Sequence, residues 1–319
     1  MEFLICVDDT DDLTKATSTG IIADAIEARL LELGFARETF GTTRHQLLLD
    51  DRIKYTSHNS SMCTALAAND SPAKMTESAR EDFVRKITKI CAETIHELKA
   101  PQCNPGLCVC FPEKLSSRRA LISFGMKGQN SILTKDMAYA LAEKEGVHLS
   151  EHGGDGTGVI GALCGVGLRL SGYDGWFRGK ITPEEVGIRN ETVLSGQLVE
   201  KTGVPVIYKG VFLPADETIA IKKDIKCLLI NHQKVIAVSK DEKHGIYRIY
   251  DKNTIKNAAA YQADLCRAFE YDNDADEFRA ESGNERTCLN CLYRRWTKQG
   301  FECVNDMIKP VSSRAMYGR

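Results

Sequence analysis

The sequence Phe3-Leu4-Ile5-Cys6-Val7-Asp8-Asp9-Thr10-Asp11-Asp12 decides the fold of the first part of the chain. Its apolar half has the length of one buried strand, and it ends abruptly in an acidic run. Thr17 or Ser18 can then cap a helix. The apolar positions that recur at helical spacing in this helix are Ile22, Ala25, Ile26, Leu30 and Leu33. The stretch therefore predicts a strand, an acidic turn and a helix.

Carboxylates packed this closely repel one another, and a cation at the end of a buried strand would relieve that repulsion. Magnesium suits oxygen ligands and usually takes one or two carboxylates, leaving its other positions to water and substrate phosphate. The N-terminus of the following helix favours anions. We therefore predict a magnesium–phosphate site at this acidic run. The alternative is an acidic, solvated turn.

A second informative stretch runs from His152 to Leu163 and is rich in glycine. Glycines let backbone N–H groups approach a polyphosphate, and the apolar helix that follows adds a favourable dipole. The stretch has neither a GxGxxG pattern after a strand nor the GK[ST] of a Walker A motif. We interpret it as the other half of a nucleotide site, with a simple turn as the alternative. The residues predicted to bind the nucleotide are Gly153, Gly154, Asp155, Gly156, Thr157 and Gly158.

Composition limits the class of protein. The chain has 319 residues, which suggests two or three domains, and 43% of them are hydrophobic. The net charge of −2 argues against a strongly basic nucleic-acid coat. No apolar run approaches the roughly 20 residues of a membrane helix, and no signal pattern is present, so we expect a cytoplasmic protein without membrane contact. Twelve cysteines then suggest thiols or metal ligands rather than disulfides.

Several shorter patterns complete the first part of the chain. His58 and Asn59 lie in a polar loop and are candidate ligand contacts, or residues of an ordinary turn. The run from Ala120 to Phe124 predicts a strand, and Thr134 predicts the cap of a helix that ends near Gly146. The cysteines that we expect to be buried thiols are Cys103, Cys108 and Cys110.

Beyond residue 204 the pattern changes to short strands, which suggests a small antiparallel barrel or meander, with Asn231-His232-Gln233 as a hairpin turn. The predicted strands are Val206–Tyr208, Val211–Leu213, Thr218–Ile221, Cys227–Ile230, Val235–Val238 and Ile246–Tyr250. We predict a catalytic α/β (α+β) region over 1–180, a small β-rich domain over 181–251 and a helical, cysteine-containing tail over 252–319.

The tail contains one CxxC motif, and four thiolates would suffice for a structural zinc site. Buried or surface thiols are the alternative. The arginines at Arg294 and Arg295 stand next to Trp296, a combination that nucleic-acid surfaces use and that solvated helix faces also show. The candidate zinc ligands are Cys266, Cys288, Cys291 and Cys303.

Taken together, these motifs resemble the archaeal tRNA-isoleucine agmatinylcytidine synthetases over about residues 1 to 180. The matching pieces, in the order of that family, are Val7-Asp8-Asp9-Thr10-Asp11, Ser18-Thr19-Gly20, Ile53-Lys54-Tyr55 with Asn59, Asn104-Pro105-Gly106-Leu107 and Gly154 to Leu163. The resemblance implies a kinase-like and a ferredoxin-like domain, followed by an OB-fold and a zinc ribbon. It also implies that ATP and magnesium phosphorylate the C2 oxygen of a wobble cytidine in tRNA, and that agmatine displaces the phosphate.

Carried over by motif, the resemblance makes Asp8, Asp9 and Asp11 the magnesium ligands or activators of the acceptor oxygen. It makes Thr19 an autophosphorylated residue, places Asn59 near the site, and assigns the ATP phosphates to the glycine-rich loop. Two departures stand out: the run from Asp12 to Thr17 differs from that of the family, and Thr157 stands where an arginine is expected. The alternatives are an ATP-dependent kinase or ligase for a small molecule, and a nucleotide-binding protein without turnover.

Overall fold

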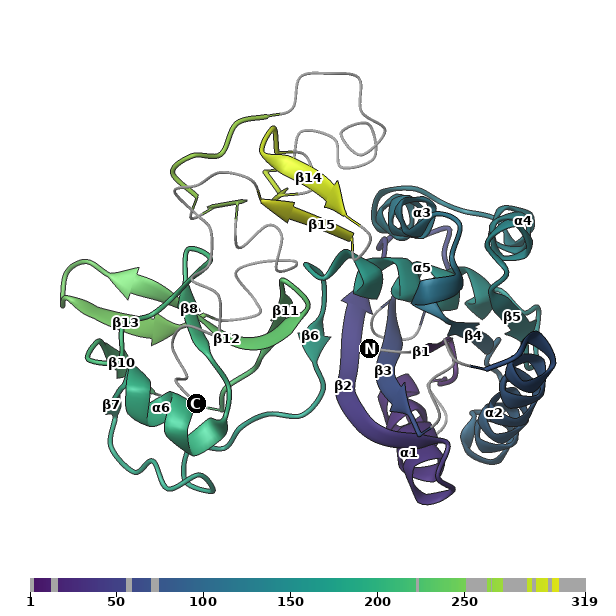
Figure 1. The fold of residues 1–319 in the computed structure, drawn as a ribbon, viewed down its shortest axis with the longest axis horizontal. Coiled ribbons are helices and arrows are strands. Elements are labelled where there is room, and N and C mark those ends of the chain that lie inside the picture. The colour runs from purple at the N-terminus through teal and green to yellow at the C-terminus, as the bar shows by residue number, and fades with distance from the viewer. Residues whose placement is uncertain are drawn as a thin grey trace. The chain divides into compact units, whose positions relative to one another are not determined.

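The computed structural model describes residues 3–12, 17–55, 59–69, 75–221, 224–250, 263–264, 266–271, 286–288, 291–297 and 300–303. The chain forms two compact units, which are described separately (Figure 1). The N-terminal unit comprises Met1–Ser171 with Lys298–Gly300, and the C-terminal unit comprises Gly172–Thr297 with Phe301–Arg319. Both combine helices with sheets, so the predicted mixture of α and β structure is confirmed.

The N-terminal unit is built on a sheet in the order β5-β4-β1-β3-β2, in which every neighbouring pair is antiparallel. Its strands are β1 (Phe3–Asp8), β2 (Ala36–Gln46), β3 (Ser60–Ala68), β4 (Gly106–Cys110) and β5 (His148–Glu151). The apolar run at the start of the chain is the central strand and is buried along its whole length. Its last residue, Asp8, lies opposite Gly106, the first residue of β4.

One face of this sheet is covered by α1 (Thr19–Glu32) and α2 (Glu77–Leu98). Alternate residues of β1 point toward these helices and share one core with them, because successive side chains of a strand face opposite sides. The prediction of Ser18 as a cap is confirmed, because its side chain accepts a hydrogen bond from the N–H of Ile21. Thr76 caps α2 in the same way and accepts a hydrogen bond from the N–H of Ala79.

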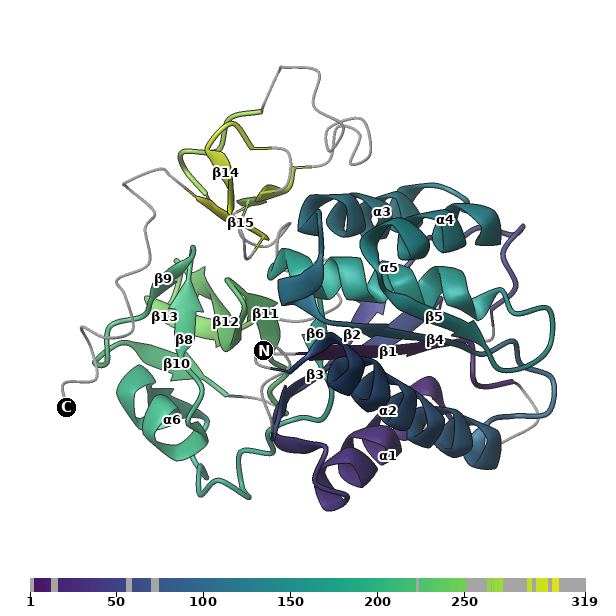
Figure 2. The same cartoon turned by 45° about the vertical axis from the view of Figure 1, so that its right-hand side comes forward.

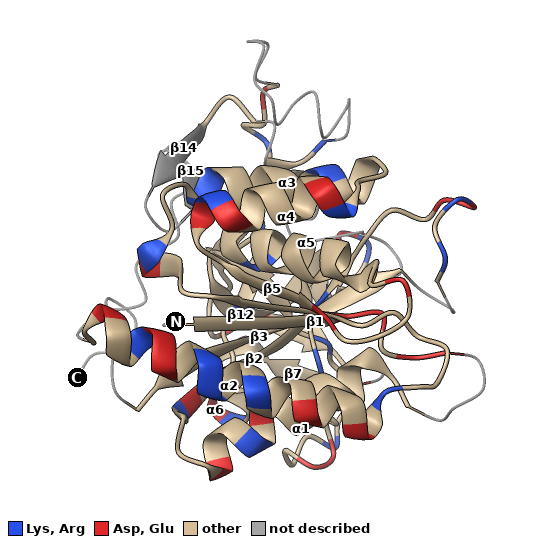
Figure 3. Cartoon of the chain, turned by 90° about the vertical axis from the view of Figure 1, so that its right-hand side faces the viewer, with Lys and Arg blue, Asp and Glu red and all other residues tan. Residues whose placement is uncertain are grey.

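The other face is covered by α5 (Gly158–Ser171), and α3 (Arg118–Asn130) packs on α5 (Figure 2). Glycines bring α5 close to both neighbours. A Cβ added at Gly165 would lie 2.5 Å from Sγ of Cys6 in β1, and one added at Gly167 would lie 1.9 Å from the carbonyl oxygen of Leu121 in α3. Side chains there would force the layers apart. Figure 3 shows α5 nearly without charge, whereas α1 and α2 carry charged residues outward.

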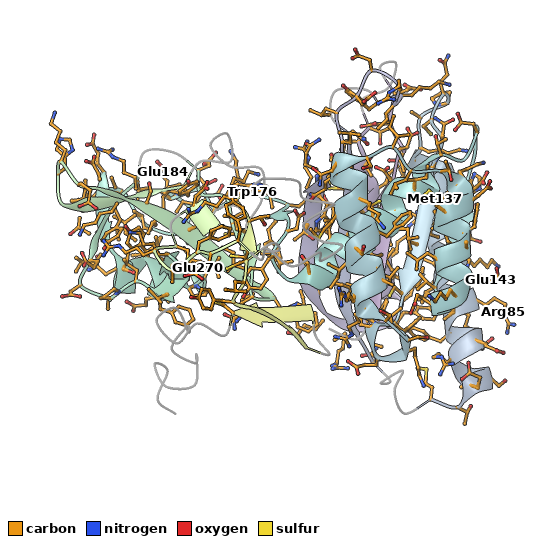
Figure 4. The ribbon with its side chains drawn as sticks, turned by 90° about the horizontal axis from the view of Figure 1, so that it is seen from above. Arg85, Met137, Glu143, Trp176, Glu184 and Glu270 are labelled. Carbon is orange, nitrogen blue, oxygen red and sulfur yellow. The ribbon has the colours of Figure 1, made fainter. Side chains whose placement is uncertain are left out.

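The predicted strand over Ala120–Phe124 is wrong, because these residues form the first half of α3. A short apolar run does not distinguish a buried strand from a buried helix. Ser117 caps the helix here, because its hydroxyl accepts a hydrogen bond from the N–H of Ala120. The prediction for α4 (Lys135–Glu145) is confirmed: Thr134 is its cap and Gly146 ends it with φ +66°. Figure 4 shows Arg85 on α2 and Glu143 on α4 on the outside of this unit.

The C-terminal unit has a mixed sheet around its own apolar core. Its elements are β6 (Trp176–Phe177), β7 (Thr192–Leu194), α6 (Ser195–Thr202), β8 (Val206–Tyr208), β9 (Val211–Phe212), β10 (Thr218–Ala220), β11 (Leu228–Ile230), β12 (Gln233–Asp241) and β13 (Ile246–Ile249). The predicted run of short strands is confirmed. The turn after β11 is confirmed as well, because Asn231 and His232 adopt φ +50° and +60°, as two-residue hairpins require.

The expectation of a purely antiparallel arrangement is wrong, since β8 runs parallel to β12 and β10 runs parallel to β13. The connections between these strands are long enough to cross over, so they need not form hairpins. Further along, β14 (Arg294–Thr297) and β15 (Gly300–Cys303) pair as a two-stranded sheet. Across the described parts of the chain, no helix has the length and apolar character to span a membrane.

Candidate functional site

The acidic run of the sequence forms a tight turn at the end of β1. Asp9 adopts φ +52°, a conformation that residues other than glycine rarely take and that is concentrated at functional sites. The carbonyl of Thr10 accepts a hydrogen bond from the N–H of Ala100, 3.0 Å away. Asp12 accepts one from the N–H of Gln102 at 2.9 Å. The segment after α2 therefore holds the turn in place.

Asp8 is buried, with 8% of its surface exposed, and its carboxylate lies against the helix α5. A Cβ added at Gly161 would lie 1.8 Å from Oδ2 of Asp8 and 3.1 Å from Cδ1 of Leu47. Burial, followed by the negative charge of Asp9, raises the pKa of Asp8 well above its usual range. The fold thus keeps a carboxylate where its charged form is disfavoured.

Asp9 is less buried, and its pKa is also raised, first by burial and then by the charges of Asp11 and Asp155. A hydrogen bond from Nδ2 of Asn104 to Oδ2 of Asp9, 2.9 Å long, works in the opposite direction because it favours the ionised form. Asp155 belongs to the glycine-rich loop. Its electrostatic effect on Asp9 shows that the two predicted motifs, far apart in the sequence, lie close together.

Asn104 joins the two motifs directly. Its Nδ2 donates to Asp9, its Oδ1 accepts from the N–H of Asp155 at 2.9 Å, and its carbonyl accepts from the N–H of Gly158 at 3.0 Å. The sequence analysis named Asn104 in a motif of the resemblance but assigned it no role in the site. The available signal was its position in Asn104-Pro105-Gly106, just before the strand that pairs with β1.

The glycine-rich loop depends on backbone conformations that favour glycine: φ is +145° at Gly153, +59° at Gly154 and +71° at Gly156. The loop N–H groups from 155 to 158 donate to acceptors of the protein itself. The first turn of α5 fits closely on the sheet, since a Cβ at Gly158 would lie 2.6 Å from the N of Gly106 and 2.9 Å from the carbonyl oxygen of Asp8. These glycines bring the helix end and the acidic turn together.

Side chains from α4 and β5 anchor this loop. Lys135 donates from Nζ to Oε1 of Glu151 at 2.9 Å and to the carbonyl of Asp155 at 2.6 Å, and the hydroxyl of Tyr139 donates to the same Glu151 oxygen at 2.8 Å. Lys54 reaches Oδ2 of Asp155 at 3.8 Å with a largely exposed side chain. Both lysines are cations that the structure brings to the loop. The sequence analysis did not include Lys135, and it named Lys54 only within a matching motif.

The remaining predicted residues occupy distinct positions. Nδ2 of Asn59 donates to the carbonyl of Leu48 at 2.7 Å, and the carbonyl of Asn59 accepts from the N–H of Leu47, whose side chain lies close to Gly161. Thr19 is the first residue of α1 and is buried, with 6% of its surface exposed. His58 lies outside the described residues.

The hydroxyl of Thr10 is a further feature of the acidic turn. It is completely buried, and it has no hydrogen-bond partner in the described part of the chain. Leaving a buried hydroxyl unsatisfied costs about 1–3 kcal/mol, and such groups in native proteins call for an explanation. The turn therefore keeps an unsatisfied polar atom between Asp9 and Asp11.

The four cysteines of the tail lie near one another in the C-terminal unit. Burial raises the pKa of Cys288 well above its usual range, and Cys291, Cys303 and Cys266 raise it further. Burial also raises the pKa of Cys266, and the backbone N–H groups of Ala268 and Phe269 oppose part of that rise. No group of three or more His, Cys, Asp or Glu side chains among the described residues is placed closely enough to hold a metal ion.

The cysteines predicted to be buried thiols, Cys103, Cys108 and Cys110, are buried. Cys108 lies opposite Cys6 in the sheet, and burial raises the pKa of its thiol well above the usual range. These thiols therefore pack within the N-terminal unit, as free cysteines commonly do.

Comparisons with known proteins give structural matches only. No family model matches this sequence, and no curated protein matches it. The structure is similar to apo TiaS, a tRNA-isoleucine agmatidine synthetase, with 22% identity and a TM-score of 0.43 over 66% of this chain and 46% of that one. The complex of TiaS with its tRNA and ATP is 21% identical, with a TM-score of 0.44 over 70% of this chain and 50% of that one. A tRNA fluorescent labeling enzyme is 18% identical, with a TM-score of 0.44 over 71% of this chain and 52% of that one. The chain thus spans about half the length of these proteins.

Proposed function

We propose that the N-terminal unit is an ATP- and magnesium-dependent phosphoryl-transfer enzyme that activates an oxygen atom for attack by an amine. The observation that carries this proposal is the position of Asn104, which hydrogen-bonds both the acidic turn and the glycine-rich loop. Phosphoryl transfer needs a cation-binding group next to a phosphate-binding group, because catalysis depends on positioning and charge neutralisation. The site supplies both within one hydrogen-bonded network.

A magnesium ion is proposed to bind at the acidic turn. The carboxylates of Asp8 and Asp9 have raised pKa values because burial and mutual repulsion disfavour their charged forms, and a cation would reverse both effects. Asp8, Asp9 and Asp11 are the residues that would hold it, with substrate phosphate completing the coordination as magnesium prefers. A bound magnesium ion would neutralise charge on the phosphates. Once ionised, an aspartate with a raised pKa is also suited to accept a proton from an acceptor hydroxyl.

ATP phosphates are proposed to bind along the loop Gly153–Gly158. The N–H groups from 155 to 158 already donate within the protein. The loop would therefore act by letting a phosphate come close to the backbone and to the positive end of the α5 dipole. Lys135 and Lys54 are the cations beside Asp155 that can neutralise phosphate charge there. They supply a positive charge that Thr157, in place of the expected arginine, does not.

The resemblance in sequence motifs suggests the acceptor, the amine and a role for Thr19. We propose tRNA as the acceptor and a small amine such as agmatine as the nucleophile, with Thr19 as a site of autophosphorylation. Because Thr19 is buried at the start of α1, its hydroxyl reaches ATP only if the first turn of that helix opens. Asn59 would hold Leu47 and Leu48 near the site through its hydrogen bonds to their backbone.

We further propose the three-part organisation predicted above: a catalytic region over 1–180 with a ferredoxin-like part, an OB-like domain over 181–251 and a cysteine-bearing tail over 252–319. Zinc is proposed for the tail because the other three cysteines act on the thiol of Cys288, and four thiolates suffice for a structural zinc site. Cys266, Cys288, Cys291 and Cys303 would hold it. The metal content of purified protein, compared with that of Cys291→Ser, tests this assignment.

The decisive experiment for the proposed function incubates the protein with γ-labelled ATP and magnesium, with and without bulk tRNA, and separates protein, RNA and small products. Label on the protein that disappears in Thr19→Ala, or release of phosphate stimulated by tRNA, supports the proposal. ATP turnover without any response to tRNA favours a kinase or ligase for a small molecule. ATP binding without turnover, unchanged by Asp8→Ala except in affinity, favours a non-catalytic nucleotide-binding protein.

A further inference from the structure

A second polar cluster lies next to the glycine-rich loop and takes no part in the proposed reaction. His148, Ser150 and His152 alternate along β5 and its end, so their side chains face the same side of the sheet. The Ser150 hydroxyl links the two imidazoles, at 3.0 Å from Nε2 of His148 and 2.9 Å from Nε2 of His152. This row of side chains sits at the edge of the sheet of the N-terminal unit.

The helix α2 and the residue that caps its C-terminus complete the cluster. The ring of His96 meets the ring of His152 edge to face, with centroids 5.7 Å apart. Nζ of Lys99 donates to the carbonyl of His152 at 2.5 Å, and it fills the space in which a Cβ of Gly153 would stand. His96 is exposed, while Lys99, His148 and His152 are half-buried, so the cluster is open to solvent on one side.

The electrostatics of the cluster favour an anion. Burial, followed by the positive charges of His96, His148 and Lys99, lowers the pKa of His152 to about 4. Burial also lowers the pKa of His148. The groups whose charges act on His152 are thus cationic when protonated, and a bound anion would favour their protonated forms.

Cys103 feels both this cluster and the acidic turn: burial raises the pKa of its thiol, the charge of Lys99 lowers it, and the charges of Asp9 and Asp12 raise it. The imidazoles are the groups on which anion binding can be observed most directly.

We propose that His96, Lys99, His148 and His152 form a phosphate-binding site beside the glycine-rich loop, separate from the acidic turn. Imidazoles and an ammonium group together offer several N–H donors to the oxygens of one phosphate, and donors of this kind make the stronger, charge-assisted hydrogen bonds. The ligand is a phosphate group, carried either by a polynucleotide backbone or by free phosphate. The proposal rests on the cluster itself and does not require the transfer reaction.

The test is a nuclear magnetic resonance titration of the full chain with inorganic phosphate at pH 6 and constant ionic strength. Histidine signals are assigned with His96→Gln, His148→Asn and His152→Asn. We expect saturable shifts of these three imidazoles and a rise of at least about one unit in the pKa of His152, which corresponds to tenfold tighter phosphate binding by the imidazolium. His244, which pairs with Asp241 in the C-terminal unit, serves as the internal control.

A variant pair separates binding from general screening. Lys99→Met should weaken phosphate binding at least about tenfold, the effect of losing one charged contact. Lys89→Met, which removes an exposed lysine of the same helix, should change nothing. Shifts that do not saturate, that appear equally at His244, or that survive in Lys99→Met would overturn the proposal. Circular dichroism of Lys99→Met, together with an unchanged titration of His244, shows whether that variant is folded.

The source of the phosphate follows from a second titration with a single-stranded RNA decamer that lacks terminal phosphates. Shifts of the same imidazoles at lower concentrations than with inorganic phosphate identify a polynucleotide backbone, whereas an effect of inorganic phosphate alone identifies free phosphate. Asp8→Asn distinguishes this proposal from the proposed function. It should abolish transfer from ATP yet leave the phosphate shifts of the histidines intact.

Discussion

Replacing Asp8 by asparagine should make the N-terminal unit more stable while removing its activity. Asp8 is buried against Gly161 and next to Asp9, so its charged form is disfavoured and its pKa is raised well above the usual range. Each pKa unit of such a shift corresponds to about 1.4 kcal/mol. Asparagine has nearly the same shape and no charge. We therefore expect Asp8→Asn to stabilise the unit at pH 7.5 by about 1–3 kcal/mol, the usual cost of burying a polar group without a partner.

The sign of the pH dependence follows from linkage. The folded state binds a proton at Asp8 more tightly than the unfolded state, whose pKa is about 3.9. Wild-type stability is therefore highest below that value, and it falls as the pH rises toward the raised pKa of the folded state. Because asparagine does not titrate, the advantage of the variant should be small near pH 4 and complete once Asp8 of the wild type is ionised.

Hydrogen exchange of the β1 amides, followed by mass spectrometry, measures this effect within one unit of a two-unit chain. At pH 7.5 the peptide that contains Phe3–Asp8 should exchange roughly 10- to 100-fold more slowly in Asp8→Asn, the equivalent of the expected free energy. Magnesium should slow exchange in the wild type but not in the variant. Equal or faster exchange in the variant at pH 7.5, or a difference that does not grow with pH, would refute the reasoning.

Three further substitutions test the site. Asn104→Ala removes the hydrogen bond to Asp9, and such a bond to a charged acceptor is worth about 1.5–3 kcal/mol. The acid limb of the pH–rate profile of phosphate release should therefore move to higher pH by about one to two units. An unchanged acid limb would contradict this role of Asn104. Gly161→Ala places a Cβ 1.8 Å from Oδ2 of Asp8, and this overpacking should lower the stability of the unit by about 1–3 kcal/mol. Hydrogen exchange measures the loss, and the double variant Asp8→Ala/Gly161→Ala should recover part of it. Thr10→Val should leave stability unchanged or raise it by about 1 kcal/mol, since the hydroxyl has no partner among the described residues, and a clear loss in urea unfolding would show that it has one.

The sequence was sufficient to predict the elements that carry the site. The strand at Phe3–Asp8, the helix capped by Ser18 and the helix capped by Thr134 each combine an apolar pattern with a capping residue, and both signals are local. The hairpin at Asn231 was predictable for the same reason. The run at Ala120 was misassigned, because Leu121 to Met126 are all buried and a short run without alternation does not distinguish a helix from a strand.

The connections between elements were not predictable in the same way. Nothing local indicates that Asn104 bonds residues far away on both sides in the sequence, or that Lys135 reaches Asp155. These contacts exist because β4 pairs with β1 and because α5 crosses the sheet, which are properties of the tertiary fold. Sequence patterns therefore identified the groups that can do chemistry, and the fold determines which of them meet.

The glycines show how the two kinds of information combine. Their spacing suggested a loop whose N–H groups bind phosphate, yet the observed N–H groups from 155 to 158 donate to the protein itself. The requirement that the structure demonstrates is steric, because Gly106, Gly158 and Gly161 let the first turn of α5 touch both the end of β1 and the carboxylate of Asp8. A helix N-terminus brought this close to a buried carboxylate carries a partial positive charge toward it. The packing that buries Asp8 therefore disfavours its charged form by desolvation and at the same time favours it through the helix dipole. A cation at the turn would favour the charged form further, and a phosphate without a cation would oppose it.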